Sequence, residues 1–347
     1  MGRPDAVHTA PAAQSGAPME FVADLRDIAS PDPGSRFLTD PRHAAELIAA
    51  ETRDRLRAVF EAMPAEPVIL LSGGVDSILL AATAVALGHR PHALTVLTAD
   101  GNDRTNAIAA ARALGLPHEI IELDGPAVVS LARASLERLE VPELWEVSYA
   151  VPMLAIGPVL DRLGFAGPIL TGSGADAIFA GGKTLAHLID SVEATAELDA
   201  LTRRESAHNF TIDRLVPDFY RRILDDRADQ LVHVYQTVRF WELAETLAPP
   251  TLFGLHDGAL ADKLCVRIAC EGLLPESARS LAWAKKSAIQ RSAGIMGALA
   301  EAARQYATAL PGARTYSDPG AEPFDAVATR LYLALLMRDQ ETGTTAD

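Results

Sequence analysis

The sequence of 347 residues has only two cysteines, no long hydrophobic run and no cluster of basic residues. Cys265 and Cys270 are too few for a disulfide framework or a four-ligand zinc site, so both are expected to be reduced, in the cytoplasm. No run of 18 apolar residues and no secretion signal is found, so no membrane partner is predicted. The net charge of -15 makes nucleic acid an unexpected main partner.

Apolar runs that alternate with helical patterns dominate the first half of the chain. Strands are predicted at 67–71, 93–98, 119–123 and 168–171, and helices at 41–63, 78–87, 105–114 and 150–163. Strands that are apolar throughout and alternate with helices indicate a doubly wound α/β fold with a parallel sheet. No strand is predicted after Gly182. The expected division is a flexible tail over 1–35, a nucleotide-binding core over 36–190 and a helical region over 191–347 that completes the substrate site.

A glycine turn, SGGVDS, follows the first predicted strand and precedes a helix. Gly73 and Gly74 lack side chains, so successive backbone N–H groups can surround an anion at the positive N-terminus of that helix. Ser72 and Ser77 add hydroxyl donors, and Asp76 offers a carboxylate for a Mg²⁺ ion that bridges phosphate oxygens. The segment therefore predicts a phosphate-binding loop, with an ordinary glycine turn as the alternative.

Two other phosphate patterns are present and incomplete. Gly182-Lys183-Thr184 imitates the end of a Walker loop, but Ala177 stands where that loop needs a glycine. Residues 172–177 (GSGADA) fit the loose dinucleotide pattern, yet no second strand follows to carry a ribose-binding acid. The first segment therefore does not predict a Walker-type site, and the second does not predict a dinucleotide-binding site.

Three motifs together carry a family resemblance. The SGGVDS turn is followed about a hundred residues later by residues 170–182 (LTGSGADAIFAGG), and then by Lys263, Arg267 and Leu274-Pro275 at matching spacing. This arrangement resembles the synthetase domain of the asparagine synthetase family, PP-loop ATP pyrophosphatases that also include the β-lactam synthetases. The first motif alone would equally suit GMP, NAD or argininosuccinate synthetases, but the second points away from them.

The resemblance implies a PP-loop, HUP-like core that uses ATP and Mg²⁺. A small-molecule carboxylate would attack the α-phosphorus of ATP and release pyrophosphate, and ammonia or an amine would then displace AMP to form an amide or a lactam. It implies Asp76 and Asp176 as metal ligands and Lys263 as the cation that neutralises pyrophosphate. The other expected ATP contacts are Ser72, Gly73, Gly74, Ser77, Leu94, Val96, Leu97, Gly172, Gly174 and Lys286.

Ser173 departs from the family pattern, which has Glu in asparagine synthetases and Tyr in β-lactam synthetases. Serine is a poor base without an activating neighbour, so the substrate carboxylate is expected to be one other than aspartate. Glu245 is the candidate for taking the proton from the amine. Gly2 stands where glutamine-using members carry cysteine, so no glutaminase domain is expected. The amine would come as ammonia, from a co-substrate or from a separate protein; a homo-oligomer is the other expected partner.

Two other functions stay open at this point. One is a PP-loop enzyme that activates an RNA base for thiolation, against which the negative charge and the lack of a Cys-x-x-Cys pair both argue. The other is a non-catalytic nucleotide-binding homologue that lost its acid at Ser173. Tyr149 and Tyr220 are expected to be core aromatics.

Overall fold

The computed structural model describes residues 35–209, 216, 218–284, 289–310, 312, 318–323, 325–331 and 333. Residues 1–34 of the predicted tail lie outside the described residues, as does Lys286. No helix in the described ranges is both long enough and apolar enough to cross a membrane.

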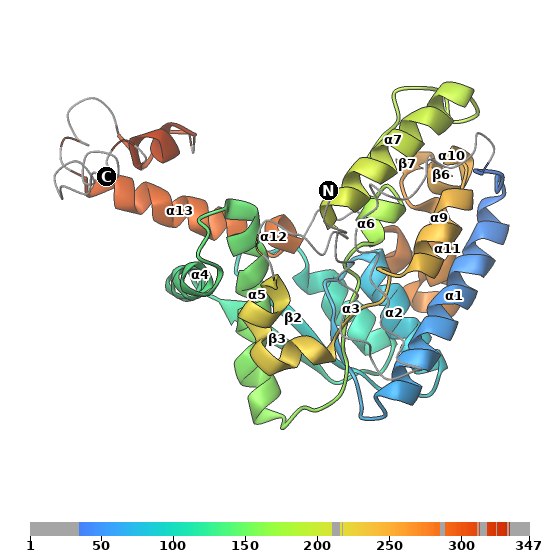
Figure 1. Cartoon of the computed structure of the whole chain (residues 1–347), viewed down its shortest axis with the longest axis horizontal. Helices are drawn as coiled ribbons and strands as arrows, with labels where there is room; N and C mark the ends of the chain where they lie inside the picture. Colours follow the sequence, from blue (N-terminus) through green and yellow to red (C-terminus); the bar gives the residue numbers. More distant parts are fainter. Residues whose placement is uncertain are drawn as a thin grey trace, which may run out of the picture.

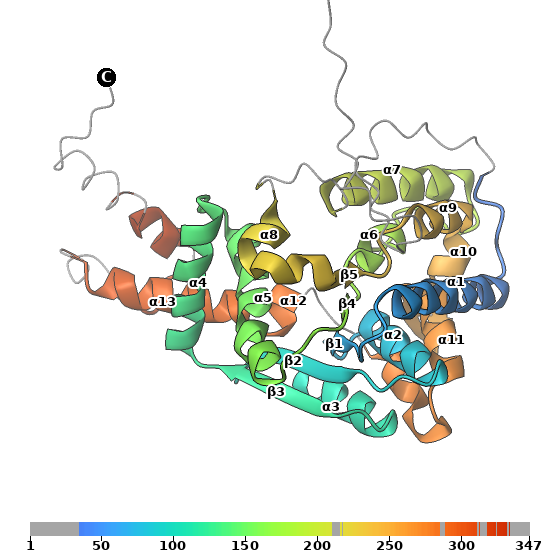
Figure 2. The ribbon, with the colours of Figure 1, turned by 60° about the horizontal axis from the view of Figure 1, so that its bottom comes forward.

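A five-stranded parallel sheet forms the centre of the molecule (Figure 2). Its order is β3-β2-β1-β4-β5, and its strands are β1 (Val68–Leu70), β2 (His92–Thr98), β3 (His118–Leu123), β4 (Ile169–Thr171) and β5 (Leu231–His233). The chain runs outward from β1 to β3 and then returns to the other side of β1 to form β4. This reversal makes the carboxyl ends of β1 and β4 neighbours at the switch point, where doubly wound sheets bind ligands.

Helices cover both faces of this sheet, which confirms the doubly wound prediction (Figure 1). One hydrophobic core includes side chains from α1 (Pro41–Ala62), α2 (Val75–Ala86), α3 (Arg104–Ala113) and α11 (Leu264–Leu273). The other core includes side chains from α4 (Gly125–Leu139), α5 (Leu144–Arg162), α8 (Phe219–Leu224) and α13 (Ile295–Thr308). Burial on both faces explains why the strands are apolar throughout.

The remaining elements complete the described fold. They are α6 (Ala175–Ile178), α7 (Val192–Asn209), η1 (Asp225–Gln230), α9 (Val238–Thr246), α10 (Pro249–Leu252), β6 (Gly254–His256), β7 (Ala259–Ala261), η2 (Glu276–Trp283) and α12 (Ile289–Ser292). Strands β6 and β7 form an antiparallel hairpin that ends two residues before Lys263. The hairpin therefore places Lys263 just after its second strand.

The prediction of no strand after Gly182 is wrong. Strand β5 pairs in parallel with β4, with Thr171 opposite His233, and β6 and β7 add the hairpin. Each of these strands has three residues, too few to show a period of two in the sequence. The central sheet thus includes a strand from beyond residue 190.

Helix α4 was not predicted from periodicity, and α5 begins earlier than expected, at Leu144. The start of α4 is nevertheless encoded locally. Asp124 caps it by accepting a hydrogen bond from the backbone N–H of Ala127 at 2.8 Å, and Pro126 lies in its first turn.

Candidate active site

The first glycine turn lies between β1 and α2 and is tightly packed. Gly73 has a φ of +72°, and a Cβ at this position would lie 3.0 Å from the carbonyl oxygen of Asp103 and from the backbone nitrogen of Ala107. Gly74 caps α2 in an extended conformation. Only glycine satisfies both the positive φ and the close contact at residue 73.

Ser72 and Ser77 brace this loop from within. Ser77 Oγ donates to the carbonyl of Gly74 at 3.0 Å and accepts from the backbone N–H of Ser72 at 3.2 Å. The hydroxyl oxygens of the two serines are 3.1 Å apart, and because the Ser77 proton is used by Gly74, Ser72 is the donor between them. Their predicted contact with phosphate stays a prediction.

The second glycine turn follows β4 and touches the first. A Cβ on Gly172 would lie 3.2 Å from Cβ of Asp76, so the two loops meet at backbone distance. Gly174, with a φ of +95°, caps the short helix α6, and Asp176 lies in its first turn. The fold therefore brings Asp76 and Asp176 to one place, as the resemblance implied.

Lys263 joins the two aspartates. Its Nζ donates to both carboxylate oxygens of Asp76 at 2.8 Å and forms an ion pair with Asp176. The Lys263 side chain is 3 % exposed, whereas that of Asp176 is 62 % exposed. Burial alone would lower the pKa of Lys263, but the carboxylates of Asp176 and Asp76 outweigh burial and raise it. Lys263 therefore carries a positive charge over the physiological pH range.

Arg267 holds the turn from which Lys263 projects. Its guanidinium donates to the carbonyl and to the carboxylate of Asp262, each at 2.7 Å, and to the carbonyl of Ala282 at 2.9 Å. The same Asp262 carboxylate accepts from the backbone N–H of Gly182. The spacing of four residues between Lys263 and Arg267 thus has a structural cause, because Arg267 fixes the residue next to the lysine.

The Ser173 hydroxyl has two side-chain partners among the described residues, Tyr149 and Gln236, and Tyr220 lies next to Tyr149. Ser173 Oγ accepts from Gln236 Nε2 at 3.2 Å and from the Tyr149 hydroxyl at 3.4 Å, and the hydroxyls of Tyr149 and Tyr220 are 3.5 Å apart. Gln236 is buried, and both tyrosines are partly buried. Both tyrosines pack against a hydrophobic core, as expected, and Tyr149 also contacts the residue that departs from the family pattern.

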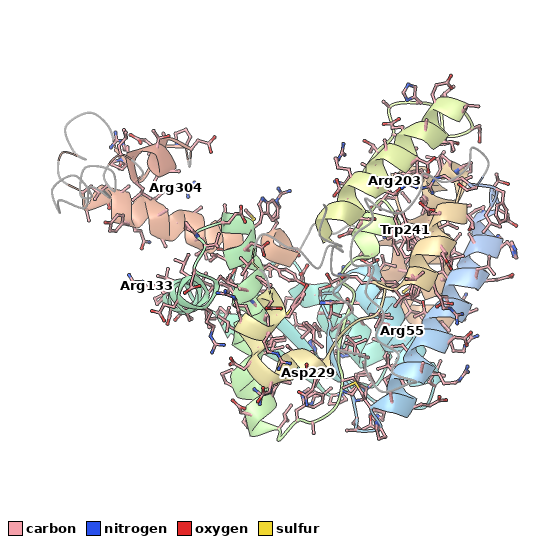
Figure 3. The ribbon with its side chains drawn as sticks, in the orientation of Figure 1. Arg55, Arg133, Arg203, Asp229, Trp241 and Arg304 are labelled. Carbon is pink, nitrogen blue, oxygen red and sulfur yellow. The ribbon has the colours of Figure 1, made fainter. Side chains whose placement is uncertain are left out.

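Glu245 pairs with an arginine and not with the residues of the aspartate–lysine cluster. Among the described residues, its carboxylate hydrogen-bonds only to Arg203, at 3.1 Å, where α7 and α9 approach each other (Figure 3). Burial raises the pKa of Glu245, and the guanidinium groups of Arg203 and Arg36 oppose that rise. The structure therefore pairs Glu245 with Arg203 instead of with Ser173 or Lys263, and its role as a base stays a prediction.

The predicted adenine-binding strand borders a small cavity of about 20 Å³. Leu94 and Val96 line it together with Ser72 of the phosphate loop and Pro152 and Met153 of α5. This volume holds about one water molecule, so an adenine ring would have to displace α5 side chains to enter. Leu97 is fully buried and does not line this cavity.

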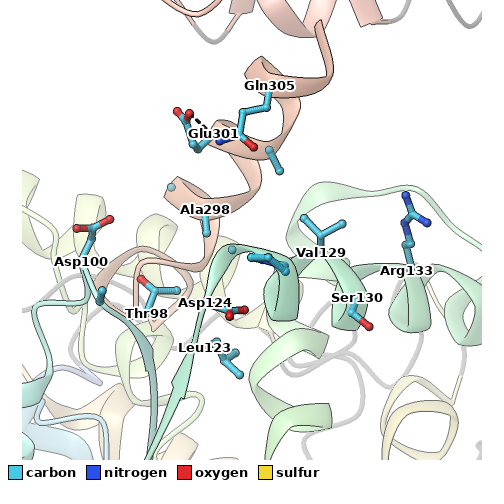
Figure 4. A pocket seen from close by; sticks show the side chains of 15 residues that line it. Thr98, Asp100, Leu123, Asp124, Val129, Ser130, Arg133, Ala298, Glu301 and Gln305 are labelled. Atoms are coloured by element: carbon cyan, nitrogen blue, oxygen red, sulfur yellow. Dashed lines mark hydrogen bonds between the residues drawn. The ribbon is translucent and has the colours of Figure 1, made fainter. Parts of the chain in front are cut away.

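A larger cavity, of about 710 Å³, lies between α4 and α13 at the ends of β2 and β3 (Figure 4). Thr98, Asp124, Arg133 and Glu301 are among the residues that line it, and none of the predicted site residues does. The residues that line this cavity thus include none of the aspartate–lysine cluster.

Sequence reasoning missed Tyr235, Gln236 and Asp262. The Tyr235 hydroxyl donates to the carbonyl of Asp76 at 3.1 Å, and burial, followed by the negative charge of Asp76, raises its pKa. Tyr235 and Gln236 follow β5, which was not predicted, so no local signal placed them at the site. Asp262 stands next to Lys263 in the third motif, and that adjacency was the signal that could have identified it.

Expected effect of Gly181→Ala. A Cβ on Gly181 would overlap Asp176 Oδ1 and Lys263 Cε, so alanine must push these side chains apart. We expect ATP-dependent turnover to fall about 100-fold with little change in melting temperature, because we expect these side chains to contact the phosphates, and a small displacement of such groups has a large effect on rate. Gly272→Ala, where an added Cβ meets nothing within 4 Å, is the control and should keep full activity. Normal turnover in Gly181→Ala would show that the lysine–aspartate contact is dispensable.

Two adjacent glycine turns at the switch point of a doubly wound sheet, with a buried lysine between their aspartates, define the PP-loop class of ATP-dependent synthetases. The family model described as asparagine synthase matches residues 52–246, which is more than half of the chain. The chain therefore belongs to the asparagine synthase family. Lys263 and Arg267 lie beyond the matched range.

No curated protein matches the sequence. Similar solved structures include NMN synthetase from Francisella tularensis, with 18% identity and a TM-score of 0.31 over 59% of this chain and 93% of that chain. NH3-dependent NAD synthetase from Campylobacter jejuni has 17% identity and a TM-score of 0.30 over 60% and 93%. A predicted tRNA methyltransferase subunit from Methanocaldococcus jannaschii has 23% identity and a TM-score of 0.23 over 47% and 74%. The assignment therefore rests on the family match.

Proposed function

We propose that this protein is an ATP-dependent ligase that forms AMP and pyrophosphate. It adenylates a small-molecule carboxylate and transfers the acyl group to ammonia or an amine, which gives an amide or a lactam. The observation that supports this most strongly is the convergence of Asp76, Asp176 and Lys263 at the carboxyl ends of β1 and β4. Membership of the asparagine synthase family supports the same reaction class.

In the first half-reaction, negative charge develops on the α- and β-phosphates as pyrophosphate leaves. Fixed cations and hydrogen-bond donors stabilise such charge, and here they are Lys263 and the backbone N–H groups of residues 73–77. Tyr235 and Arg267 act indirectly, because they hold Asp76 and the turn before Lys263 in place. Attack by the carboxylate then gives the acyl-adenylate.

The two aspartates fit Mg²⁺. Mg²⁺ in nucleotide sites is held by one or two carboxylates together with phosphate oxygens, and Asp76 and Asp176 already gather around one positive group. When bound, Mg²⁺ would supply positive charge to the phosphate oxygens. The orientation of both carboxylates by one lysine is the feature that supports this assignment.

In the second half-reaction the amine must lose a proton as it attacks the acyl-adenylate. Glu245 is our candidate base, since its raised pKa makes its carboxylate a better proton acceptor than an exposed glutamate. Ser173, with two hydrogen bonds to its oxygen, keeps its proton available for donation to the substrate.

A pyrophosphate-release screen tests the proposal. The purified chain is incubated with ATP, Mg²⁺ and paired panels of carboxylates and amines, and the nucleotide product is identified. We expect AMP and pyrophosphate in stoichiometric amounts with the amide. ADP and phosphate would contradict the mechanism, and ATP binding without turnover across the panels would favour the non-catalytic homologue.

Expected nitrogen source. Glutamine hydrolysis needs a reactive cysteine thiolate, and both cysteines of this chain are buried. Burial raises the pKa of Cys265 to about 12, and that of Cys270 also rises because of burial. We therefore expect ammonia or a primary amine, and not glutamine alone, to support product formation by the 347-residue polypeptide. Glutamine-dependent product, measured by mass spectrometry with ¹⁵N-amide glutamine, would contradict this.

Expected effect of Glu245→Gln. Glutamine keeps the size of the side chain and a hydrogen-bonding group but cannot accept the amine proton. We expect amide formation to fall at least about 100-fold while exchange between pyrophosphate and ATP, driven by the acid alone, survives. Equal loss of both would mean that Glu245 supports the fold or ATP binding through Arg203.

Glu51→Gln is the matched control for this comparison. Glu51 on α1 also has a pKa raised by burial and also pairs with an arginine, Arg239, at 2.6 Å. It has no assigned role in the reaction, so we expect both steps to continue at the wild-type rate in this variant.

A further inference from the structure

Lys263 occupies the position that a cation would take between the two carboxylates. Its ammonium contacts both oxygens of Asp76 and one oxygen of Asp176. The ammonium neutralises one of the two carboxylate charges and would itself repel a divalent cation that entered beside it. The lysine and a metal ion therefore compete for the same two carboxylates.

The fold maintains this arrangement at a conformational cost. Lys263 has a φ of +50°, in the left-handed region that side chains other than glycine, asparagine and aspartate rarely adopt. Arg267 and Asp262 hold that backbone conformation, and Gly181 leaves the space through which the lysine reaches Asp176. Lys263 is therefore a buried residue with fixed contacts to the aspartates, and not a solvated surface charge.

We infer that Lys263 makes this site select a divalent cation that is already bound to a triphosphate over the free cation. A free cation must displace the ammonium from the two carboxylates that it contacts, Asp76 and Asp176. A metal–triphosphate complex brings phosphate oxygens that accept the ammonium, so the carboxylates are released to the metal at little loss. The metal–triphosphate complex thus favours the arrangement in which the Lys263 ammonium contacts phosphate over the one in which it contacts the carboxylates. A ligand shifts a population only through such a difference in affinity. This inference rests on the proposed ATP site.

Mn²⁺ binding, followed by electron paramagnetic resonance on the full chain, tests the inference without any acid or amine substrate. With no nucleotide, we expect Lys263→Met to bind Mn²⁺ at least about tenfold more tightly than the wild type. With the non-hydrolysable analogue α,β-methylene ATP, we expect the Mn²⁺ affinity of the wild type to rise at least about tenfold, and that of Lys263→Met to rise much less.

Lys183→Met is the matched control. Lys183 lies two residues after Gly181 and pairs with Glu205 at 3.0 Å. The variant removes one positive charge near the site and should leave the Mn²⁺ affinity without nucleotide unchanged. Equal Mn²⁺ affinity in Lys263→Met and the wild type would overturn the inference. If Lys263→Met does not fold, as judged by circular dichroism, Lys263→Gln replaces it.

The wild type alone gives a further decisive result. Mn²⁺ binding that is as tight without the analogue as with it would overturn the inference whatever the variants do. If the analogue does not bind to any form of the protein, the proposed function itself fails. Binding of the analogue without any effect of Lys263 on Mn²⁺ would overturn only the inference.

Discussion

Asp76→Asn and Asp176→Asn should each lower pyrophosphate-forming turnover by at least about 100-fold, because each removes one of the two charges that we propose hold Mg²⁺ on the phosphates. We expect both variants to stay folded. In either variant the buried ammonium of Lys263 keeps the other aspartate as its partner. Activity is measured as pyrophosphate release at saturating ATP, and folding by circular dichroism.

Asp54→Asn is the control for this pair. Asp54 is an exposed aspartate of α1 that pairs with Arg57 at 3.0 Å, and an exposed pair of this kind contributes little. Its variant should keep full activity. Near-normal turnover in both Asp76→Asn and Asp176→Asn would remove the PP-loop mechanism from this protein, because no other pair of carboxylates is assigned to the nucleotide.

Arg267→Met should destabilise the protein by about 3 kcal/mol, because it removes the guanidinium from the half-buried Asp262 carboxylate and leaves two backbone carbonyls without their donor. Arg267 is 5 % exposed and donates to Asp262 and to the carbonyls of Ala282 and Ala284. Methionine has a similar length and fills the space, but it makes none of these bonds. Urea unfolding should show a lower midpoint with an unchanged slope.

The same variant should also lose activity under conditions in which it is fully folded. Asp262 precedes Lys263, and without Arg267 the turn from which the lysine reaches the aspartates loses the guanidinium that bonds to the Asp262 carbonyl and carboxylate. Arg57→Met removes an exposed arginine and should change the unfolding free energy by less than about 0.5 kcal/mol. Wild-type stability in Arg267→Met would mean that Asp262 finds another partner or is protonated.

The amino-acid sequence by itself determined the class of fold and the first three residues of the site. Four apolar runs that alternate with helical segments predict a doubly wound sheet, because only strands buried on both faces can be apolar throughout. The glycine turns place Asp76 and Asp176 directly after two of those strands. In a parallel sheet the carboxyl ends of all strands share one edge, so local patterns were enough to place both aspartates there, and the motif spacing added Lys263.

Only the tertiary structure decided what these residues contact. Strand β5 has three residues and no readable period, so its place beside β4 comes from pairing across a long stretch of chain. Tyr235 and Gln236 reach Asp76 and Ser173 only because that strand is there. Likewise, the sequence predicted Glu245 as a base, whereas folding pairs it with Arg203 on α7. Contacts between distant segments depend on how helices and strands pack, and no local pattern of residues encodes that packing.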